Sequence, residues 1–356
     1  MAVWQIACGD AGRKYEDLFL NHDVMFCGPS EYGPFDPVTY GNATQLGEYT
    51  PAKINQIRSF ANDVLPNDIV LLRSGYHVVT FGVVDVAGYA HDPRFDDVYG
   101  WDVEHTHRVV WQHHLIDQFS TLQSTRGLFA SRKQIPTFTG VNDAAILAPI
   151  QNLLAQAITR PLNDLPVPPP PPLTLEKFGD ALFSRGLSYD AVHRVRLSLE
   201  KQQRLLAWYS SGLATDRPKE HEVVAHVILP LMMALGWSEQ QLAVEWHKID
   251  LAVFRDTPTD RARCELVCEA KSLGHGLQDV KQQAEEYVSN LNLSNCRRIV
   301  VADGGRFYLY RQLNGIWENR PSGYMNVSKL RLNHICPANT SAVDTLIALT
   351  PANLGR

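Results

Sequence analysis

Positive charge, paired cysteines and long apolar runs are all scarce in this chain of 356 residues, and the scarcity of positive charge is the most restrictive. The formal net charge at pH 7 is −5. A protein that binds nucleic acid non-specifically usually carries a strong basic footprint. Any contact with DNA or RNA must therefore come from local basic patches, whereas an enzyme with an acidic active site is not excluded.

The cysteine usage and the hydropathy pattern exclude two further classes of protein. None of the six cysteines forms a CxxC pair, which favours a reducing compartment over a disulfide framework. No apolar run approaches the roughly 20 residues that cross a bilayer, and the N-terminal residues lack the basic-then-apolar layout of a signal peptide. We therefore expect a cytoplasmic protein with no membrane partner.

A proline-rich stretch at 161–173 is the clearest boundary in the chain. Five of its prolines are consecutive, from Pro168 to Pro172. Consecutive prolines favour a stiff, extended polyproline II segment that has no backbone donors for a sheet. The sequence thus predicts two domains, 1–160 and 174–356, joined by this linker.

Short apolar segments separated by glycine turns dominate the first 112 residues. This pattern is typical of a small β-barrel with added helices. A helical apolar face runs from 51 to 64, and one or two helices are expected between 115 and 159, the best candidate being 144–158. The expected strands are 4–8, 23–28, 67–72, 76–86 and 100–111.

Two histidines at alternate positions, His105 and His107, would share one face of the strand expected there. Imidazoles placed in this way can bind zinc. No third ligand is well placed by its spacing, so a sensor pocket or a plain β-barrel role is favoured over a metal site.

The C-terminal half has an α/β order of elements. Helices are expected at 175–184, capped by Thr174, and at 189–211, 219–235 and 276–291. Strands are expected at 243–245, 249–255, 265–270, 298–302 and 306–312. The second helix carries a basic face that is either solvated or lies along a phosphate backbone: Arg194, Arg196, Lys201 and Arg204.

Three residues in this half form a chemical pattern. Asp250 lies at the start of one apolar run, and Glu269 and Lys271 lie two apart at the end of another. Residues two apart on a strand face the same way. Two carboxylates and a lysine can hold Mg²⁺ and activate water for phosphodiester hydrolysis. A purely structural role is disfavoured, because unpaired buried carboxylates are costly.

These residues belong to a longer ordered set that resembles the PD-(D/E)xK nuclease superfamily. The set is Leu235-Gly236-Trp237, Ile249-Asp250-Leu251, Glu269-Ala270-Lys271, Gln283 with Tyr287, and Asp303-Gly304. Within that superfamily it looks most like the nuclease domain of type I restriction endonuclease motor subunits, over about 219–312. Ile249 departs from the pattern, which has proline there.

The resemblance implies an α/β restriction-endonuclease-like mixed sheet and an endodeoxyribonuclease. Asp250 and Glu269 would coordinate Mg²⁺, with Mn²⁺ as a substitute. Lys271 would orient or deprotonate the attacking water and stabilise the charge of the transition state. Gln283 and Tyr287 share a helix face, which in the family points at the site and the nucleic-acid backbone.

The helix at 219–235 should supply a further acid. Glu220 shares the inward stripe with Val227, Leu231 and Leu235, so it is favoured as the acid on the metal side. Glu222 remains the alternative. Either could instead be a first-turn acid that stabilises the helix N-terminus.

The segment Gly9-Asp10-Ala11-Gly12-Arg13-Lys14-Tyr15-Glu16-Asp17-Leu18-Phe19, with Asn67–Leu72 and Phe81–Val84, resembles the EVE branch of the PUA-like barrels over roughly 2–112. That resemblance implies a modified base, flipped from the duplex, in an aromatic-walled pocket. Each aromatic residue could instead belong to the core or the surface. The candidate walls are Trp4, Tyr15, Phe19, Tyr76, Trp101 and Trp111.

Three functions follow as hypotheses. The first is a modification-dependent restriction or anti-phage endonuclease that reads modified double-stranded DNA and cuts it, as a homodimer because a double-strand cut needs two sites. The second is a nuclease switched by a small nucleotide bound to the N-terminal barrel. The third is a non-catalytic nucleic-acid-binding protein, which the intact set of Asp250, Glu269 and Lys271 argues against.

Overall fold

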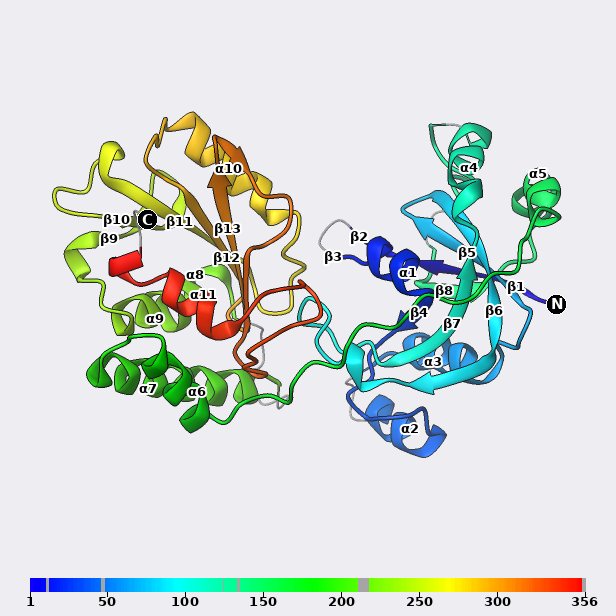
Figure 1. The fold of residues 1–356 in the computed structure, drawn as a ribbon, viewed down its shortest axis with the longest axis horizontal. Helices are drawn as coiled ribbons and strands as arrows, with labels where there is room; N and C mark the ends of the chain where they lie inside the picture. Colours follow the sequence, from blue (N-terminus) through cyan, green and yellow to red (C-terminus); the bar gives the residue numbers. More distant parts are fainter. Residues whose placement is uncertain (11–12, 46–48, 124, 133–134, 211–217, 354–356) are drawn as a thin grey trace. The chain divides into compact units, whose positions relative to one another are not determined.

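The computed structural model describes residues 1–10, 13–45, 49–123, 125–132, 135–210 and 218–353 (Figure 1). Ala11 and Gly12 of the N-terminal motif, and Ser211 at the expected end of a helix, lie outside the described residues. The chain divides into two compact units, Met1–Pro168 and Pro169–Arg356. Each unit has its own mixed sheet, so the protein is α+β. No helix in the described ranges is both long and apolar enough to cross a membrane.

The first unit contains a six-stranded sheet in the order β4-β7-β6-β5-β1-β8. Strands β1 and β5 are parallel, and the other neighbours are antiparallel. The strands are β4 (Val24–Cys27), β7 (His105–Trp111), β6 (His77–His91), β5 (Ile69–Ser74), β1 (Val3–Ala7) and β8 (Phe138–Gly140). A separate two-stranded ribbon joins β2 (Gly9–Asp10) and β3 (Arg13–Lys14).

The expected β-barrel does not close. A barrel needs its first and last strands to pair with a consistent stagger. Here β4 and β8 are the two edges, and among the described strands they do not pair with each other. Both are short, with four and three residues, so each offers little backbone for closure.

Helices surround this sheet, and more of them occur than the sequence predicts. The helix α3 (Pro51–Asn62) starts as expected, because the Thr50 side chain accepts from the Lys53 amide and Pro51 occupies the first turn. The helices α4 (Ile116–Leu122) and α5 (Ala144–Leu154) also lie within the expected range. The unpredicted helices are α1 (Glu16–His22) and α2 (Pro37–Gln45). Phe81, Phe119 and Ile150 are among the buried residues that pack α4 and α5 against the sheet.

The second unit contains a seven-stranded sheet in the order β14-β13-β12-β11-β10-β9, with β15 paired to β13. Only β11 and β12 run parallel, and the helix α10 (Val280–Asn290) makes the crossover that a parallel pair requires. The strands are β9 (Leu242–Trp246), β10 (Ile249–Phe254), β11 (Cys264–Ala270), β12 (Arg298–Ala302), β13 (Arg306–Leu313), β14 (Ile316–Trp317) and β15 (Gly323–Asn326).

Helices cover both faces of this sheet (Figure 1), which explains why its central strands β10 and β11 are buried throughout. The helix α10 packs over β11 and β12. The opposite face carries the main core, shared with α6 (Leu175–Ser184), α7 (Tyr189–Ser210), α9 (Leu229–Ala234) and α11 (Ala342–Ala348). The Thr174 side chain caps α6 as expected.

The helix expected at 219–235 is interrupted. It begins as α8 (Glu220–Val223), widens into a π-helical segment at Val224–Ile228 and continues as α9. Pro230 has no N–H and cannot donate to the preceding turn, which accounts for the irregular turn just before it. Segments of this kind are frequent at functional sites.

Both ends of the proline-rich linker are held by contacts within their own unit. On the first unit, the Arg160 guanidinium binds the fully buried Asp23 carboxylate at 2.5 and 2.6 Å, and the Asn163 amide donates to the same group at 2.7 Å. On the second unit, the Leu173 amide donates to the Leu330 carbonyl at 2.7 Å, and Arg331 donates to the Pro170 carbonyl.

Candidate active site and ligand cavity

Asp250, Glu269 and Lys271 meet in the second sheet, where β10 begins and the neighbouring β11 ends. The antiparallel register Leu251↔Cys268 brings Asp250 next to the end of β11, where its Oδ2 accepts from the Ala270 amide at 2.6 Å. Lys271 Nζ lies 2.7 Å from Glu269 Oε1. The structure thus brings together the three residues that the sequence singles out.

The strand alternation determines which face carries these acids. Cys268 and Ala270 on β11, and Leu251 on β10, belong to the core on the α9 face. Side chains alternate along a strand, so Asp250 and Glu269 project to the opposite face, the one that α10 covers.

Burial dominates the electrostatics of the site. Glu269 is 3% exposed, and burial raises its pKa from 4.5 to about 7, although Lys271 opposes the change. Burial also raises the pKa of Asp250, against the Ala270 amide and Lys271. Burial alone would lower the pKa of Lys271, but its hydrogen bond to Glu269 and the nearby carboxylates outweigh burial and raise it.

One oxygen of the site has no partner. Glu269 Oε1 is bound to Lys271, while Glu269 Oε2 is buried and has no hydrogen-bond partner among the described residues. An unsatisfied buried carboxylate oxygen carries a desolvation penalty. A cation or a hydrogen-bond donor that reached this oxygen would remove the penalty.

The two acids of the opening helix have different places. Glu220 Oε1 lies 3.6 Å from Lys271 Nζ, so this acid is on the side of the site. Glu222 Oε2 accepts from the Lys219 amide at 2.8 Å and closes a capping box at the helix start. Of the two candidates, Glu220 has the position expected of an acid near the metal.

Gln283 and Tyr287 share one face of α10, as their spacing predicts, and Gln283 Nε2 donates to the Tyr287 hydroxyl at 3.1 Å. The side-chain hydrogen bonds and ion pairs of the three site residues in the described structure go to Ala270, Glu220 and one another. In the described structure Gln283 and Tyr287 are thus hydrogen-bonded to each other, and neither side chain is hydrogen-bonded to the three site residues.

The donor set suits Mg²⁺ and does not suit zinc. Among the described residues, no three His, Cys, Asp or Glu side chains are placed to hold a metal ion. Mg²⁺ is usually held by one or two carboxylates, with water and phosphate oxygens completing its shell. Asp250 and the unpartnered Oε2 of Glu269 meet that requirement. At the zinc candidate, His105 instead bonds Tyr40 and Tyr89, and His107 bonds the Phe60 carbonyl.

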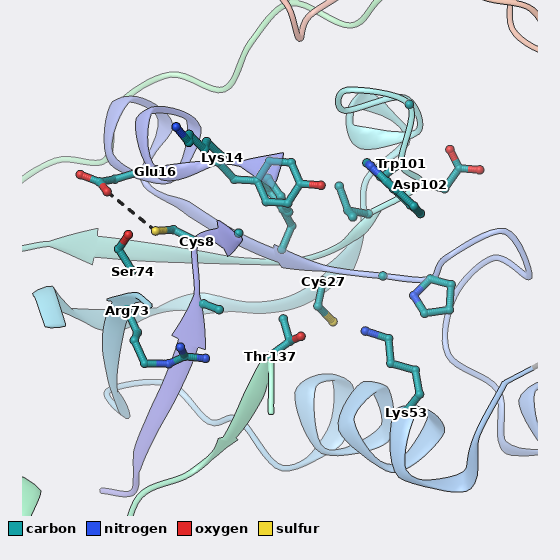
Figure 2. A pocket seen from close by; sticks show the side chains of 18 of the residues that line it. Cys8, Lys14, Glu16, Cys27, Lys53, Arg73, Ser74, Trp101, Asp102 and Thr137 are labelled. Carbon is teal, nitrogen blue, oxygen red and sulfur yellow. Dashed lines mark hydrogen bonds between the residues drawn. The ribbon is translucent and has the colours of Figure 1, made fainter. Parts of the chain in front are cut away.

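The first unit contains a cavity of about 1160 Å³ (Figure 2). Its walls come from β1, β4, β5, α1, α3 and the loop at 100–103. Tyr15 and Trp101 are the two members of the expected aromatic set that line it.

The other four aromatic candidates lie elsewhere. Trp4 stacks on Phe138 and its indole N–H donates to Asp68. Phe19 and Trp111 are fully buried and stack on each other. Tyr76 is 45% exposed and is absent from the cavity lining. Residue type and spacing do not record tertiary partners, so aromatic residues of the core could not be distinguished from those of the cavity.

Charged and thiol groups, which the sequence did not assign to a pocket, make up much of the lining. The Arg73 guanidinium is buried and held by neutral acceptors: Gln5 Oε1 at 2.8 Å, the Pro136 carbonyl at 3.2 Å and the Gly75 carbonyl. Cys8 Sγ lies 3.8 Å from Glu16 Oε2. Burial raises the pKa of Cys8 to about 12 and also raises that of Glu16. A charged residue directly after an apolar strand, such as Arg73, was the available signal.

A glycine brings the loop with Trp101 close to β4. A Cβ added to Gly28 would lie 2.3 Å from the Asp102 carbonyl oxygen and 3.1 Å from Val103 Cγ1. Real Cβ atoms do not approach backbone so closely, so only glycine permits this contact. Gly28 therefore sets the position of the loop that carries Trp101.

The basic face of α7 is mainly exposed, and Arg204 pairs with Glu200 four residues before it. Exposed pairs of this kind contribute little. Among the described residues, no contact of this helix points to a ligand.

No protein-family model matches the chain, and no curated protein matches it significantly.

Proposed function

We propose that the second unit is a Mg²⁺-dependent endonuclease that hydrolyses DNA phosphodiester bonds, and that the first unit reads a modified base. The observation that carries the proposal is the buried Glu269 Oε2 without a partner, next to Asp250 and beside a lysine that binds the other oxygen of the same carboxylate. A structural pair would satisfy both oxygens. A site waiting for a divalent cation would leave one available.

Each residue of the site then has a role. Asp250 and Glu269 would hold Mg²⁺, which polarises a phosphate oxygen and activates water when bound. The Ala270 amide fixes the Asp250 carboxylate through its hydrogen bond. Lys271 contributes a positive charge that stabilises the charge developing on the phosphate. Glu220 would add a carboxylate from the helix, and Gln283 with Tyr287 would contact the nucleic-acid backbone.

The cavity of the first unit supports the reader role. It is concave, and rings line it along with polar groups, which is how an extruded base is held and identified. A small nucleotide signal fits less well, because its phosphates need an excess of cations. The lining instead combines the cations Lys14, Lys53 and Arg73 with four acids. Because each active site cuts one strand, we propose a homodimer for double-strand cleavage.

The test uses plasmid DNA that is unmodified or carries methylated, hydroxymethylated or glucosylated cytosine, with Mg²⁺ or with EDTA. We expect cleavage of a modified plasmid in Mg²⁺ only, and none by Lys271→Ala. Lys177→Ala, a lysine on α6 away from the site, is the matched control and should cut normally. If wild type and Lys271→Ala behave alike on every plasmid, the nuclease proposal fails.

A further inference from the structure

The cavity of the first unit is large for a plain nucleobase. Pockets for drug-sized ligands span roughly 300–1000 Å³, and this cavity measures about 1160 Å³. A base with one added methyl group is much smaller than such a ligand and would leave most of the space filled with water. The volume fits a base that carries a bulky substituent.

The charges of the lining narrow the nature of that substituent. The lining contains three cationic residues and four acidic residues. The cations are Lys14, Lys53 and Arg73, and the acids are Glu16, Asp17, Glu31 and Asp102. A lining without an excess of cations does not favour a polyanion. It does offer both hydrogen-bond donors and acceptors, and a hydroxyl group uses both. A neutral group rich in hydroxyls therefore matches these walls better than a phosphate chain or a run of unpaired nucleotides.

The two ends of the cavity are lined by different kinds of side chain. Figure 2 shows Trp101 and Asp102 at one end of the hollow, and Glu16, Cys8 and Ser74 at the other. An aromatic ring gives a flat surface on which a base stacks. The other end has a carboxyl group and a hydroxyl, and its thiol stays protonated at neutral pH because burial raises the pKa of Cys8. One end suits the base and the other suits its extension.

We infer that this cavity takes a base enlarged by a neutral sugar, such as a glycosylated pyrimidine, with the base at Trp101 and the sugar hydroxyls at Glu16 and Ser74. The inference rests on the proposed reader function and names its ligand class. It assigns a function to the end of the cavity at Glu16 and Ser74, which a domain that recognises only small base modifications would not need.

The experiment measures binding of the full-length protein, in EDTA, to duplexes of one sequence. The duplexes carry cytosine, hydroxymethylcytosine or glucosylated hydroxymethylcytosine at one position. We expect the glucosylated duplex to bind at least ten-fold more tightly than the hydroxymethylated one. Equal or weaker binding of the glucosylated duplex overturns the inference. If Mg²⁺-dependent cutting of methylated or hydroxymethylated DNA persists in that case, the proposed function stands without it. If modified DNA is neither bound in preference nor cut, both the inference and the proposed function are refuted.

Two variants locate the two ends. Glu16→Ala should reduce the preference for the glucosylated duplex by about ten-fold, the effect of one lost hydrogen bond to a charged group, and leave binding of the hydroxymethylated duplex unchanged. Trp101→Ala should weaken both modified duplexes. Tyr76→Ala, an exposed aromatic residue outside the lining, is the control and should change neither. A Glu16→Ala variant that weakens all duplexes equally would overturn the assignment of the sugar end.

Discussion

Replacing Glu269 with glutamine should stabilise the protein at high pH in the absence of metal. The carboxylate of Glu269 is buried, and its pKa is about 7 instead of 4.5. One pKa unit corresponds to about 1.4 kcal/mol, so ionised Glu269 lowers the free energy of unfolding by roughly 2 to 4 kcal/mol. Glutamine keeps an acceptor for Lys271 and cannot ionise, so the variant escapes this cost.

The pH window follows from the direction of the shift. The folded protein holds the Glu269 proton more tightly than the unfolded chain, so its stability falls as pH rises from about 4.5 to 7 and then levels off. Below that window both states are protonated and the cost vanishes. The gain of Glu269→Gln should thus be small at pH 5 and reach its full size at pH 8. The glutamine amide can also change the free energy of unfolding by an amount that does not depend on pH. Subtracting the gain at pH 5 from the gain at pH 8 removes that contribution.

The assay is urea unfolding in EDTA at pH 5, 6, 7 and 8, followed by tryptophan fluorescence. Glu265→Gln is the matched control, since Glu265 is buried on the same strand but paired with Arg255, and it should show no gain at pH 8. Adding Mg²⁺ at 100 times its Kd should stabilise wild type by about 2.7 kcal/mol and leave Glu269→Gln almost unaffected. A stability difference that is the same at pH 5 and pH 8 would refute the reasoning.

Three further predictions concern other positions. Asp250→Ala should abolish plasmid cleavage with circular dichroism unchanged, and a variant that still cuts would show that another acid acts. Glu220→Gln should slow cleavage with little loss of stability, whereas Glu222→Ala, which removes the acceptor of the Lys219 amide, should lower the free energy of unfolding by roughly 0.5–2 kcal/mol and leave the cleavage rate intact; the two rates and two urea midpoints decide this. Gly28→Ala should push the loop at Asp102 away and weaken binding of modified DNA, while Mg²⁺-dependent nicking of a pre-bound substrate persists; unchanged binding would count against the loop's role.

The elements of the second unit could be predicted from the sequence because its buried strands are runs of mostly apolar residues and its turns carry strong signals. Ile249 to Phe254 is one such run, and Thr174 gives α6 a clear start. Pro230 was a visible signal that the helix at 219–235 is interrupted, but the form of the interruption, a π-helical segment, depends on packing and could not be predicted. The short strand β15 depends on pairing with β13, which no local pattern records.

The first unit was harder to predict, for a different physical reason. The strands β1, β4, β5, β6 and β7 were located approximately, whereas β2, β3 and the edge strand β8 were not predicted. Whether a sheet closes depends on the pairing of its two edge strands. The cavity depends on tertiary contacts too. Lys53, Arg73 and Thr137 are far apart in the sequence and reach one hollow only through the sheet and α3. Residue type alone favoured aromatic residues that turned out to be core, such as Trp111.

The anchored ends of the linker set the length of the tether between the two units. Arg160 and Asn163 are bound on one unit, Pro170 and Leu173 on the other. The Asp164 carbonyl is also bound on the first unit, 2.9 Å from His22 Nδ1. The span between these anchors is therefore 165–169, which in an extended polyproline conformation reaches on the order of 15 Å. In the proposed enzyme, a tether of that length would limit the distance between the bound modified base and the cleaved bond. The cut positions would then vary by only a few base pairs. Lengthening the segment would broaden the distribution of cut positions, which sequencing of the product ends would reveal.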